Sequence, residues 1–457
     1  MKEKLKSIGI VAVTAIVMGN MIGAGIFTIP NAIGQYGWYG IIAFALTAAG
    51  ALLLGLVFAN LARRMPKTGG PYAYTRAVFG DFPGFWIGWG YWIGLWTGQV
   101  AIAVTFASYL GIFIPPLRES LVYSGAAALA ALVFVTAVNV RGVRTAGAFA
   151  VVTTVIRALP LLAIATVGWW WFHPGNYATA LPSGNTAFMA ITAAATITLF
   201  SFLGLESGTV PAGDVREPRK TIPRATMIGI VAVAFLYIAS TVVVMGVVRA
   251  DALASGTTAF ADAGREMWGR VGYYAVAFAG VVSTLGALSG FTLLNGQVPY
   301  AAAVDHLFPK QFARVNRHGA PAWGMVVSSA LVGICMIVGY ALLITAGKNS
   351  AASLSTASII VSTLSTVLPY AFCAMAEVIL IVTTKDPAGR SVGLLLIVPA
   401  IAFVYSLLII WGAGPQSIVA GFFLLLIGLP VYAFIRWSET KDDPKTPGLE
   451  TEEANAA

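Results

Sequence analysis

Long hydrophobic stretches alternate with short polar segments along almost the whole chain. About twelve of these stretches reach the roughly 20 residues that an α-helix needs to cross the hydrocarbon core of a bilayer. The pattern therefore predicts an all-α integral membrane protein. The predicted spans are residues 8–33, 38–62, 83–113, 119–139, 145–172, 189–213, 226–248, 273–302, 323–345, 352–383, 392–412 and 417–437.

Composition supports this prediction and argues against a nucleic-acid-binding protein. Hydrophobic residues make up 58% of the 457 positions and charged residues 10%, whereas a soluble domain carries about a quarter charged residues. The formal net charge is +9, but the charges lie in short loops and form no continuous basic face. The expected partner is therefore the lipid bilayer. Cys335 and Cys373 lie inside apolar segments and predict neither a disulfide framework nor a metal site, and no cofactor is expected.

The distribution of Lys and Arg predicts the orientation. With a cytoplasmic N-terminus, Arg157 lies within a span and the outside loops contain only Arg118, Arg249, Arg265, Arg270 and Lys348. An excess of basic residues on one side is typical of the cytoplasmic face. We therefore expect a plasma (inner) membrane protein with both termini in the cytoplasm. Residues 1–437 are expected to form one transmembrane domain, and the polar tail at 438–457 is expected to be disordered.

Two predicted spans contain glycines where a membrane helix should be continuous. The first span holds Gly19, Gly23 and Gly25. Glycine weakens a helix interior by about 1 kcal/mol relative to alanine, and it lets the backbone approach a ligand. The sixth span holds Glu206 in Gly204-Leu-Glu-Ser-Gly208, and a carboxylate at membrane depth usually marks a functional site. For the first span alone, a small-residue face that packs helices together is an equal alternative.

The positions of these two spans favour a transporter. They open the first and second blocks of five spans, at about residues 8–172 and 189–383, which two extra helices follow at about 392–437. Interrupted spans at corresponding positions of two halves are typical of a substrate site near the membrane midplane. The unwound backbone would direct N–H groups at an anionic substrate carboxylate, with help from the helix dipoles.

Several short motifs occur in a characteristic order. They are Gly19-Asn-Met-Ile-Gly-Ala-Gly-Ile-Phe27, Pro66-Lys-Thr-Gly-Gly-Pro-Tyr-Ala-Tyr74, Phe79-Gly80, Ser201-Phe-Leu-Gly-Leu-Glu-Ser207, Glu217-Pro-Arg-Lys-Thr-Ile-Pro223, Leu307-Phe-Pro309 and Phe312-Ala-Arg-Val-Asn316. Together they resemble the amino acid–polyamine–organocation superfamily, and within it the basic amino acid/polyamine antiporters, which include arginine/agmatine and lysine/cadaverine exchangers. The resemblance implies a leucine-transporter-like 5+5 inverted repeat plus two helices, and a possible homodimer.

The resemblance also implies roles for single residues. The stretch that binds the substrate carboxylate corresponds to Asn20, Gly23, Ala24 and Gly25. Other substrate-binding positions correspond to Gln99, Phe200, Phe291 and Ser362, and Leu203 is expected to line the same pocket. An inner gate with a pH-sensitive carboxylate corresponds to Tyr91, Glu206 and Tyr370.

Departures from the arginine exchanger leave the substrate open. Phe200 and Phe291 stand where that exchanger has tryptophans, and Ala24 stands where it has a serine. Phenylalanine is a weaker cation–π partner than tryptophan. An apolar pocket of Phe200, Leu203 and Phe291 therefore suits a neutral or hydrophobic amino acid at least as well as arginine.

Arg157 lies in the middle of the fifth predicted span. In many superfamily members a lysine occupies the similar place, where sodium-coupled relatives hold a cation. A guanidinium can donate to unwound carbonyl groups as a bound cation would, and it keeps its proton. We therefore expect Arg157 to replace the cation and transport to be sodium-independent. The alternative is that Arg157 reaches an interface or pairs with a carboxylate.

These observations predict a secondary transporter that works by alternating access and exchanges an amino acid for a related amino acid or its amine. A proton-coupled permease for neutral or hydrophobic amino acids is the alternative. A channel would need rings of charged residues or a repeated carbonyl filter, and an enzyme would need a nucleophile–base pair or a metal cluster. The spans contain neither pattern, so no enzyme is expected, and a channel or membrane sensor is a weaker alternative.

Overall fold

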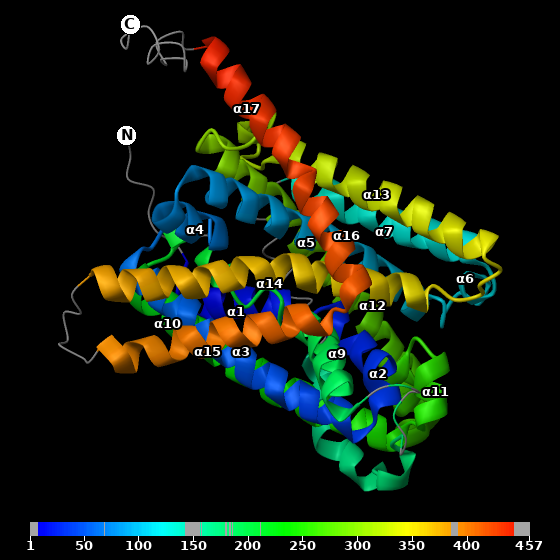
Figure 1. Cartoon of the computed structure of the whole chain (residues 1–457). Coiled ribbons are helices and arrows are strands. Elements are labelled where there is room, and N and C mark those ends of the chain that lie inside the picture. The colour runs from blue at the N-terminus through cyan, green and yellow to red at the C-terminus, as the bar shows by residue number, and fades with distance from the viewer. Residues whose placement is uncertain are drawn as a thin grey trace, which may run out of the picture.

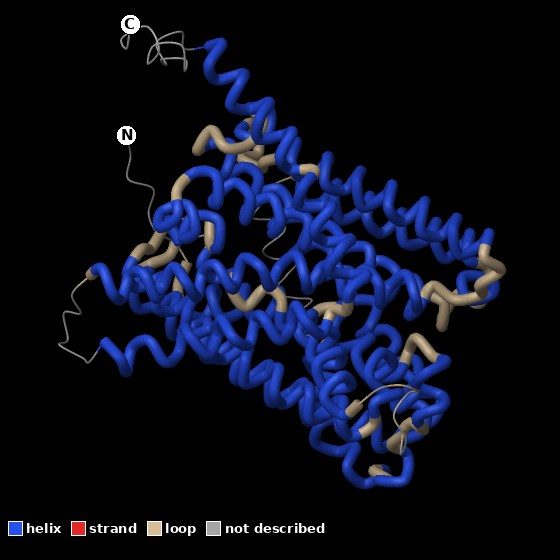
Figure 2. Tube along the Cα trace, in the orientation of Figure 1, coloured by secondary structure: helices blue, strands red, loops and turns tan. Residues whose placement is uncertain are grey.

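The computed structural model describes residues 8–67, 69–141, 156, 158–178, 181, 184, 186–210, 212–384 and 392–442. Within these ranges every regular element is a helix, and the one strand-like pairing is an isolated parallel bridge between Ile8 and Val215. Figure 2 shows this helical architecture. The predicted all-α fold is confirmed.

Across the described ranges, 11 stretches are long and apolar enough to cross a membrane. They are α1 (Ile10–Met21) with α2 (Ala24–Ile33), α3 (Trp38–Arg64), α5 (Asp81–Leu110), α7 (Leu121–Val140), α9 (Ala187–Leu199) with the 3-10 turns η4 (Phe200–Phe202) and η5 (Ser207–Thr209), α10 (Pro218–Val247), α12 (Ala259–Val304), α13 (Ala322–Thr345), α14 (Ala352–Thr383), α15 (Val392–Gly412), and α16 (Pro415–Leu426) with α17 (Gly428–Asp442). The span predicted at 145–172 lies partly outside the described residues, and its described part contains an apolar helix at Ala158–Trp171.

Several helix boundaries differ from the prediction. Helix α10 begins at Pro218 instead of 226, with proline in the first helical turn, where its missing N–H costs nothing. Helix α12 contains two helical segments that meet at Gly269, whose backbone is not helical (φ 65°, ψ −150°), and the segment after Gly269 agrees with the predicted start at 273 within a few residues. The last span consists of α16 and α17, and α17 continues to Asp442, into the tail for which we predict disorder. Hydropathy locates the apolar middle of a helix, whereas its polar end turns resemble loops.

Bonds between loops and helix termini define one end of the molecule. Arg64 at the end of α3 donates to Oγ1 of Thr384 over 2.8 Å. Arg76 on the short helix α4 (Pro71–Phe79) pairs with Asp305, which follows α12, over 2.7 Å. We call this end the basic end, because it also carries Arg63, Lys67, Lys310 on η7 (Lys310–Ala313), and Arg436 on α17.

Other bonds define the opposite end. The side chain of Asn31 on α2 donates to the carbonyl oxygen of Leu253 on α11 (Ala250–Ser255) over 2.9 Å. Arg118 on α6 (Pro116–Glu119) donates to the hydroxyl of Tyr273 over 3.0 Å. In Figure 1 the end of α14 and helix α4 lie on the left, and α6 and α11 lie on the right.

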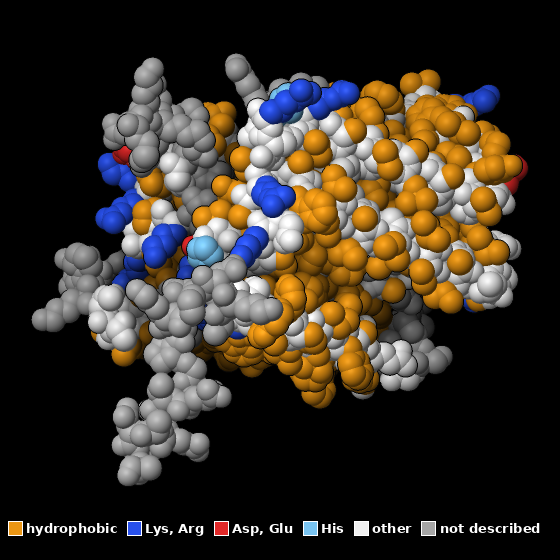
Figure 3. Space-filling view, turned by 90° about the horizontal axis from the view of Figure 1, so that it is seen from above, with side chains coloured by type: hydrophobic (Ala, Val, Ile, Leu, Met, Phe, Trp, Pro, Cys, Tyr) orange, Lys and Arg blue, Asp and Glu red, His pale blue; other side chains and the backbone are white. Residues whose placement is uncertain are grey.

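The surface matches a protein surrounded by lipid. Hydrophobic side chains cover much of the face in Figure 3, and most of the visible Lys and Arg side chains lie in its left half. Val133, Phe235 and Ile337 on three different helices are 67%, 70% and 58% exposed. Exposed apolar patches of this extent are rare on soluble monomers and mark contact with an apolar environment. The chain is therefore a multi-pass membrane protein.

The helices around the interior form neighbouring pairs that correspond between the two predicted blocks. Helix α3 packs along α10, and α5 packs along α12; α14 lies against both α5 and α15 (Figure 1). Helices α3 and α10 are the second spans of the first and second predicted blocks, and α5 and α12 are the third spans. The exact bounds of the two repeats stay a prediction.

Candidate transport site

The first predicted break lies between α1 and α2. Helix α1 ends at Met21, α2 begins at Ala24, and Ile22 and Gly23 have non-helical backbone angles. The residue at the N-cap of α2 is Gly23, which has no side chain to cap the helix. The first N–H groups of a helix have no partner within it, so the start of α2 can bind an anion such as a carboxylate. The side chain of Ala24, for which we predict a substrate contact, lies outside the described part of the structure.

A tyrosine supports the other side of this break. The hydroxyl of Tyr237 on α10 donates to the carbonyl oxygen of Met21 over 2.6 Å, across 216 residues of sequence. A buried carbonyl without a partner costs about 1–3 kcal/mol. This bond therefore stabilises the end of α1, and the sequence analysis does not identify Tyr237, because its partner is a backbone atom far away in the chain.

The second break follows α9. The chain passes through η4, a turn at Leu203–Glu206 and η5, and Gly204 has φ +98°, which favours glycine. A Cβ atom on Gly204 would lie 2.8 Å from Cβ of Asn20. A Cβ atom on Gly25 would lie 2.8 Å from Cα of Ser201. The two breaks are therefore in direct contact, and the glycines permit it.

The predicted gate residues meet in the structure. Tyr91 on α5 and Tyr370 on α14 donate to Oε1 and Oε2 of Glu206, respectively. Glu206 is 1% exposed, and both tyrosines are fully buried. Each carboxylate oxygen thus has a donor from a different helix.

Three predicted substrate residues converge on a residue that the sequence analysis does not single out. A Cβ atom on Gly98 would lie 2.7 Å from Oγ of Ser362, 3.2 Å from the ring of Phe291 and 3.4 Å from the ring of Phe200. The two rings and Leu203 are 3–5% exposed. Because Gly98 has no side chain, α5, α12, α14 and the second break can pack closely together at this point. In the sequence it is one of several glycines in α5, and only the fold distinguishes it.

The two polar residues predicted to contact substrate already have protein partners. The amide of Gln99 donates to Oγ1 of Thr292 over 2.8 Å and accepts from Asn295 over 2.7 Å. Ser362 donates to the carbonyl oxygen of Gly94 over 2.6 Å. In this state Gln99 joins α5 to α12 and Ser362 joins α14 to α5, so a direct substrate contact would require these bonds to rearrange.

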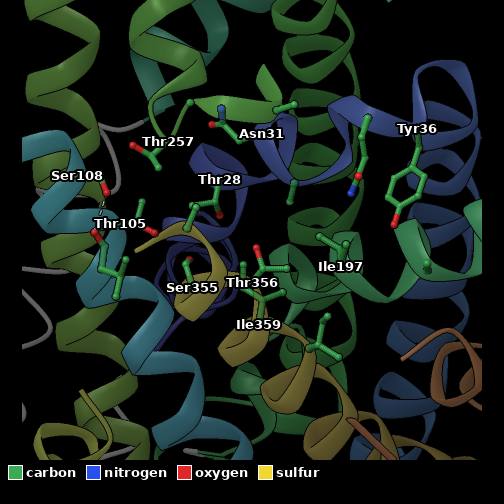
Figure 4. A pocket seen from close by; sticks show the side chains of 18 of the residues that line it. Thr28, Asn31, Tyr36, Thr105, Ser108, Ile197, Thr257, Ser355, Thr356 and Ile359 are labelled. Carbon is green, nitrogen blue, oxygen red and sulfur yellow. Dashed lines mark hydrogen bonds between the residues drawn. The ribbon is translucent and has the colours of Figure 1, made fainter. Parts of the chain in front are cut away.

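A cavity lies at the end opposite the basic end. It has a volume of about 380 Å³ and lies among α2, α5, α9, α14 and the segment between α11 and α12. Figure 4 shows the side chains of Thr28, Thr105, Ser355 and Thr356 around the same space. Ile197 and Ile359 also line it, about one helical turn before Phe200 and Ser362. Its described lining contains polar and apolar side chains and no charged one.

Ion pairs join several helices at the basic end. Arg76 contacts Asp81 over 2.9 Å and Asp305 over 2.7 Å, and Arg436 contacts Asp81 over 3.1 Å. Tyr72 donates to Oδ2 of Asp305 over 3.0 Å. Burial and the nearby Asp305 carboxylate raise the pKa of the Tyr72 phenol, so it remains a donor. These contacts join α4, α5, α17 and the residue that follows α12 at the basic end.

Two expectations concern ions. Arg157, for which we predict a role in place of a cation, lies outside the described residues. Within the described ranges, no group of three or more His, Cys, Asp and Glu side chains could hold a metal ion.

Comparison with known proteins places the chain among transporters. It is 30% identical over 429 residues to the cadaverine/lysine antiporter of Escherichia coli (strain K12), covering 94% of this chain and 95% of that protein. It is 29% identical over 467 residues to the putative arginine/ornithine antiporter of Bacillus subtilis (strain 168), covering 95% and 98%. It is 28% identical over 442 residues to the putrescine transporter PotE of Haemophilus influenzae, covering 96% and 99%.

The family match extends over almost all of the chain. A family model described as amino acid permease matches residues 8–435, which include both breaks, the Tyr91–Glu206–Tyr370 cluster and all helices up to the middle of α17. The relatives are transporters and not enzymes, as the sequence predicts. The predicted superfamily is confirmed: this chain belongs to the amino acid permease family.

Proposed function

We propose that this protein exchanges an amino acid for a related amino acid or its amine by alternating access. One observation carries the proposal: the uncapped start of α2 lies against the second break, between an open cavity on one side and the Tyr91–Glu206–Tyr370 cluster on the other. A substrate held there would be reachable from one end and sealed from the other. Transport then requires the cavity to close and the cluster to open.

The substrate is expected to bind with its two ends in different surroundings. Its carboxylate would accept hydrogen bonds from the N–H groups at the start of α2. Its side chain would lie between Phe200 and Phe291, beside Gly98. The relatives named above carry lysine, cadaverine, putrescine, arginine or ornithine by name, which favours a basic amino acid and its amine. The two phenylalanines keep a neutral amino acid as the second candidate.

We further propose that the basic end faces the cytoplasm and that the protein resides in the inner membrane. The concentration of Lys and Arg at that end supports this orientation. The closed gate lies on the same side, so the structure would correspond to an outward-facing state. Cysteine labelling at an added site on the α6 loop and at one near α4, in intact cells, tests the orientation: the α6 site should react with an impermeant reagent and the α4 site should not.

Counterflow in proteoliposomes tests the exchange function. Vesicles loaded with unlabelled lysine, arginine, ornithine, cadaverine or putrescine should accelerate uptake of the matching labelled compound from the bath, whereas empty vesicles should not. A neutral amino acid series run in parallel decides between the two substrate classes. Equal uptake into loaded and empty vesicles for every compound would contradict exchange.

Sodium independence and dimer formation stay proposals with their own tests. Replacement of sodium by choline should leave counterflow unchanged, and Arg157→Ala should abolish it if the guanidinium replaces a bound cation; wild-type rates in that variant would remove Arg157 from the mechanism. A homodimer should appear as twice the protomer mass in light scattering of the detergent-solubilised protein.

A further inference from the structure

A second glutamate lies buried on the basic side of the gate. Glu377 on α14 is 2% exposed, although its position near the end of a predicted span suggests an interface. Its Oε1 accepts a hydrogen bond from Nδ2 of Asn60 on α3 over 2.7 Å. No described residue donates to its Oε2, which is also buried. The carboxyl group therefore has one hydrogen bond where an ionised carboxylate in a protein interior needs several.

Glu377 lies on the same face of α14 as the gate. Tyr370 precedes it by about two helical turns, and Cys373 lies between them on that face. The ring of Phe58 on α3 packs against Tyr370 with centroids 5.3 Å apart, and Asn60 then contacts Glu377. The interface of α3 and α14 thus connects the gate carboxylate Glu206, through Tyr370, to a second carboxyl group nearer the basic end.

Few charged groups are available to compensate a charge on Glu377. Arg64, on the same helix as Asn60, acts on it through its charge, but the guanidinium donates to Thr384 and to the carbonyl oxygen of Leu380. Arg63 is exposed. The titratable groups on the other helices packed against α14 are Tyr72, Tyr74 and Arg76 on α4, Asp81, Tyr91 and Tyr109 on α5, and Tyr405 on α15, and α14 itself carries Tyr370 and Cys373. Arg76 is paired with Asp81 and Asp305.

We infer that Glu377 is a proton-binding site of the transport cycle, separate from Glu206 and on the basic side of the gate. While that side is closed, the carboxyl group holds a proton, because a lone hydrogen bond from Asn60 does not compensate a buried charge. When α3 and α14 move apart and water enters, the proton leaves to the cytoplasmic solution and the carboxylate is hydrated or meets Arg64. The inference rests on the proposed alternating-access function and adds a second titrating group to it.

The competing explanation is a structural bond that only joins α3 to α14. Glu377→Gln separates the two, because the glutamine side chain has the same shape and still accepts from Asn60, but it cannot bind or release a proton. Glu377→Asp keeps a titratable group. Glu266→Gln is the matched control, because Glu266 is an exposed glutamate on α12 near the opposite end.

The experiment is counterflow at a series of pH values on the basic side, with the pH on the other side held constant. Wild type and Glu266→Gln should show the same pH dependence. Glu377→Gln should retain counterflow but lose most of the response, so that a tenfold rate change across the series falls to about twofold or less, and Glu377→Asp should retain a displaced response. The inference is overturned if Glu377→Gln follows the wild-type curve. Absence of counterflow in wild type would instead overturn the proposed function.

A second measurement needs no variant. A hydrophobic carbodiimide adds to protonated carboxyl groups buried in a membrane protein and leaves a stable N-acylurea on the side chain. Mass spectrometry of treated wild-type protein should find the adduct on Glu377, with a yield that falls as the pH on the basic side rises. An unmodified Glu377 at acidic pH, in a sample whose counterflow is intact beforehand, would overturn the inference even if Glu377→Gln fails to fold.

Discussion

The hydroxyl of Tyr370 on α14 donates a hydrogen bond to Oε2 of Glu206, a residue 164 positions away in the chain. Tyr91 on α5 donates to the other oxygen, Oε1. Three segments that are distant in sequence therefore meet at one carboxylate. Under the alternating access proposed above, Glu206 and the two tyrosines form a gate that opens only when at least one of these bonds breaks.

Removal of one gate hydroxyl should weaken the closed state. Tyr91→Phe or Tyr370→Phe deletes a donor to a buried carboxylate, and hydrogen bonds to charged groups contribute about 1.5–3 kcal/mol. Thermal unfolding in detergent should show a loss of this size for each variant. The double variant should deviate from additivity by about 0.5–3 kcal/mol because both tyrosines share one partner. Tyr123→Phe, at a position 57% exposed on α7, serves as the control; strict additivity would argue against a shared gate.

Glu206→Gln should change the pH dependence of exchange without abolishing it, because Glu377 still titrates in this variant. The amide cannot titrate, and it has one acceptor oxygen where the carboxylate has two, so one of the two tyrosines loses its acceptor. Counterflow between pH 5 and 8, roughly the physiological window, is the measurement. A curve identical to wild type would show that Glu206 is a structural hydrogen-bond acceptor and not a proton sensor.

Gly98→Ala should impair substrate binding more than stability. The added methyl group would lie 2.7 Å from Oγ of Ser362 and 3.2 Å from the ring of Phe291, and overpacking of this kind costs about 1–3 kcal/mol. We expect a KM for counterflow raised about tenfold or more. Gly333→Ala on α13 is the matched control, because its nearest neighbour would be an ordinary 3.6 Å away. An unchanged KM for Gly98→Ala would move the substrate site away from this point.

Phe291→Trp should shift preference toward cationic side chains. Tryptophan is the better cation–π partner, and a whole contact of this kind contributes about 0.5–1 kcal/mol at exposed sites. We therefore expect the KM for arginine or lysine, relative to a neutral amino acid of similar size, to fall by at most about 2–5-fold. Competition of each unlabelled compound against one labelled substrate gives the ratio. A ratio that does not change would indicate that the substrate side chain does not face Phe291.

Tyr237→Phe should destabilise the first break. It removes the donor to the Met21 carbonyl, which stays buried, and the expected loss is about 1–3 kcal/mol in unfolding free energy. The same thermal measurement applies, and exchange should slow at elevated temperature before it does so in wild type. If the variant unfolds at the same temperature as wild type, a water molecule must replace the hydroxyl as the donor to the Met21 carbonyl.

Local sequence predicts much of this architecture because the relevant signals are local. Span length and hydropathy identify the membrane helices, and Gly23 and Gly204 identify both breaks within a few residues. The resemblance to the exchangers predicts Tyr91, Glu206 and Tyr370 as gate residues, and the structure brings these three side chains together. Helix ends are less predictable: the early start of α10 consists of polar turns that hydropathy cannot distinguish from loops.

By itself, the sequence determines that this is a multi-span membrane protein of the amino acid permease family with two interrupted helices, because membrane length, glycine and short motifs are properties of contiguous residues. The tertiary structure alone decides which partners the buried polar groups have. In the fold, Gln99 forms hydrogen bonds with Thr292 and Asn295, and Gly98 lies beside two aromatic rings. Asn60 is the only described hydrogen-bond partner of the Glu377 side chain. These contacts join helices that are far apart in the chain, and their geometry depends on how the helices cross rather than on any local pattern.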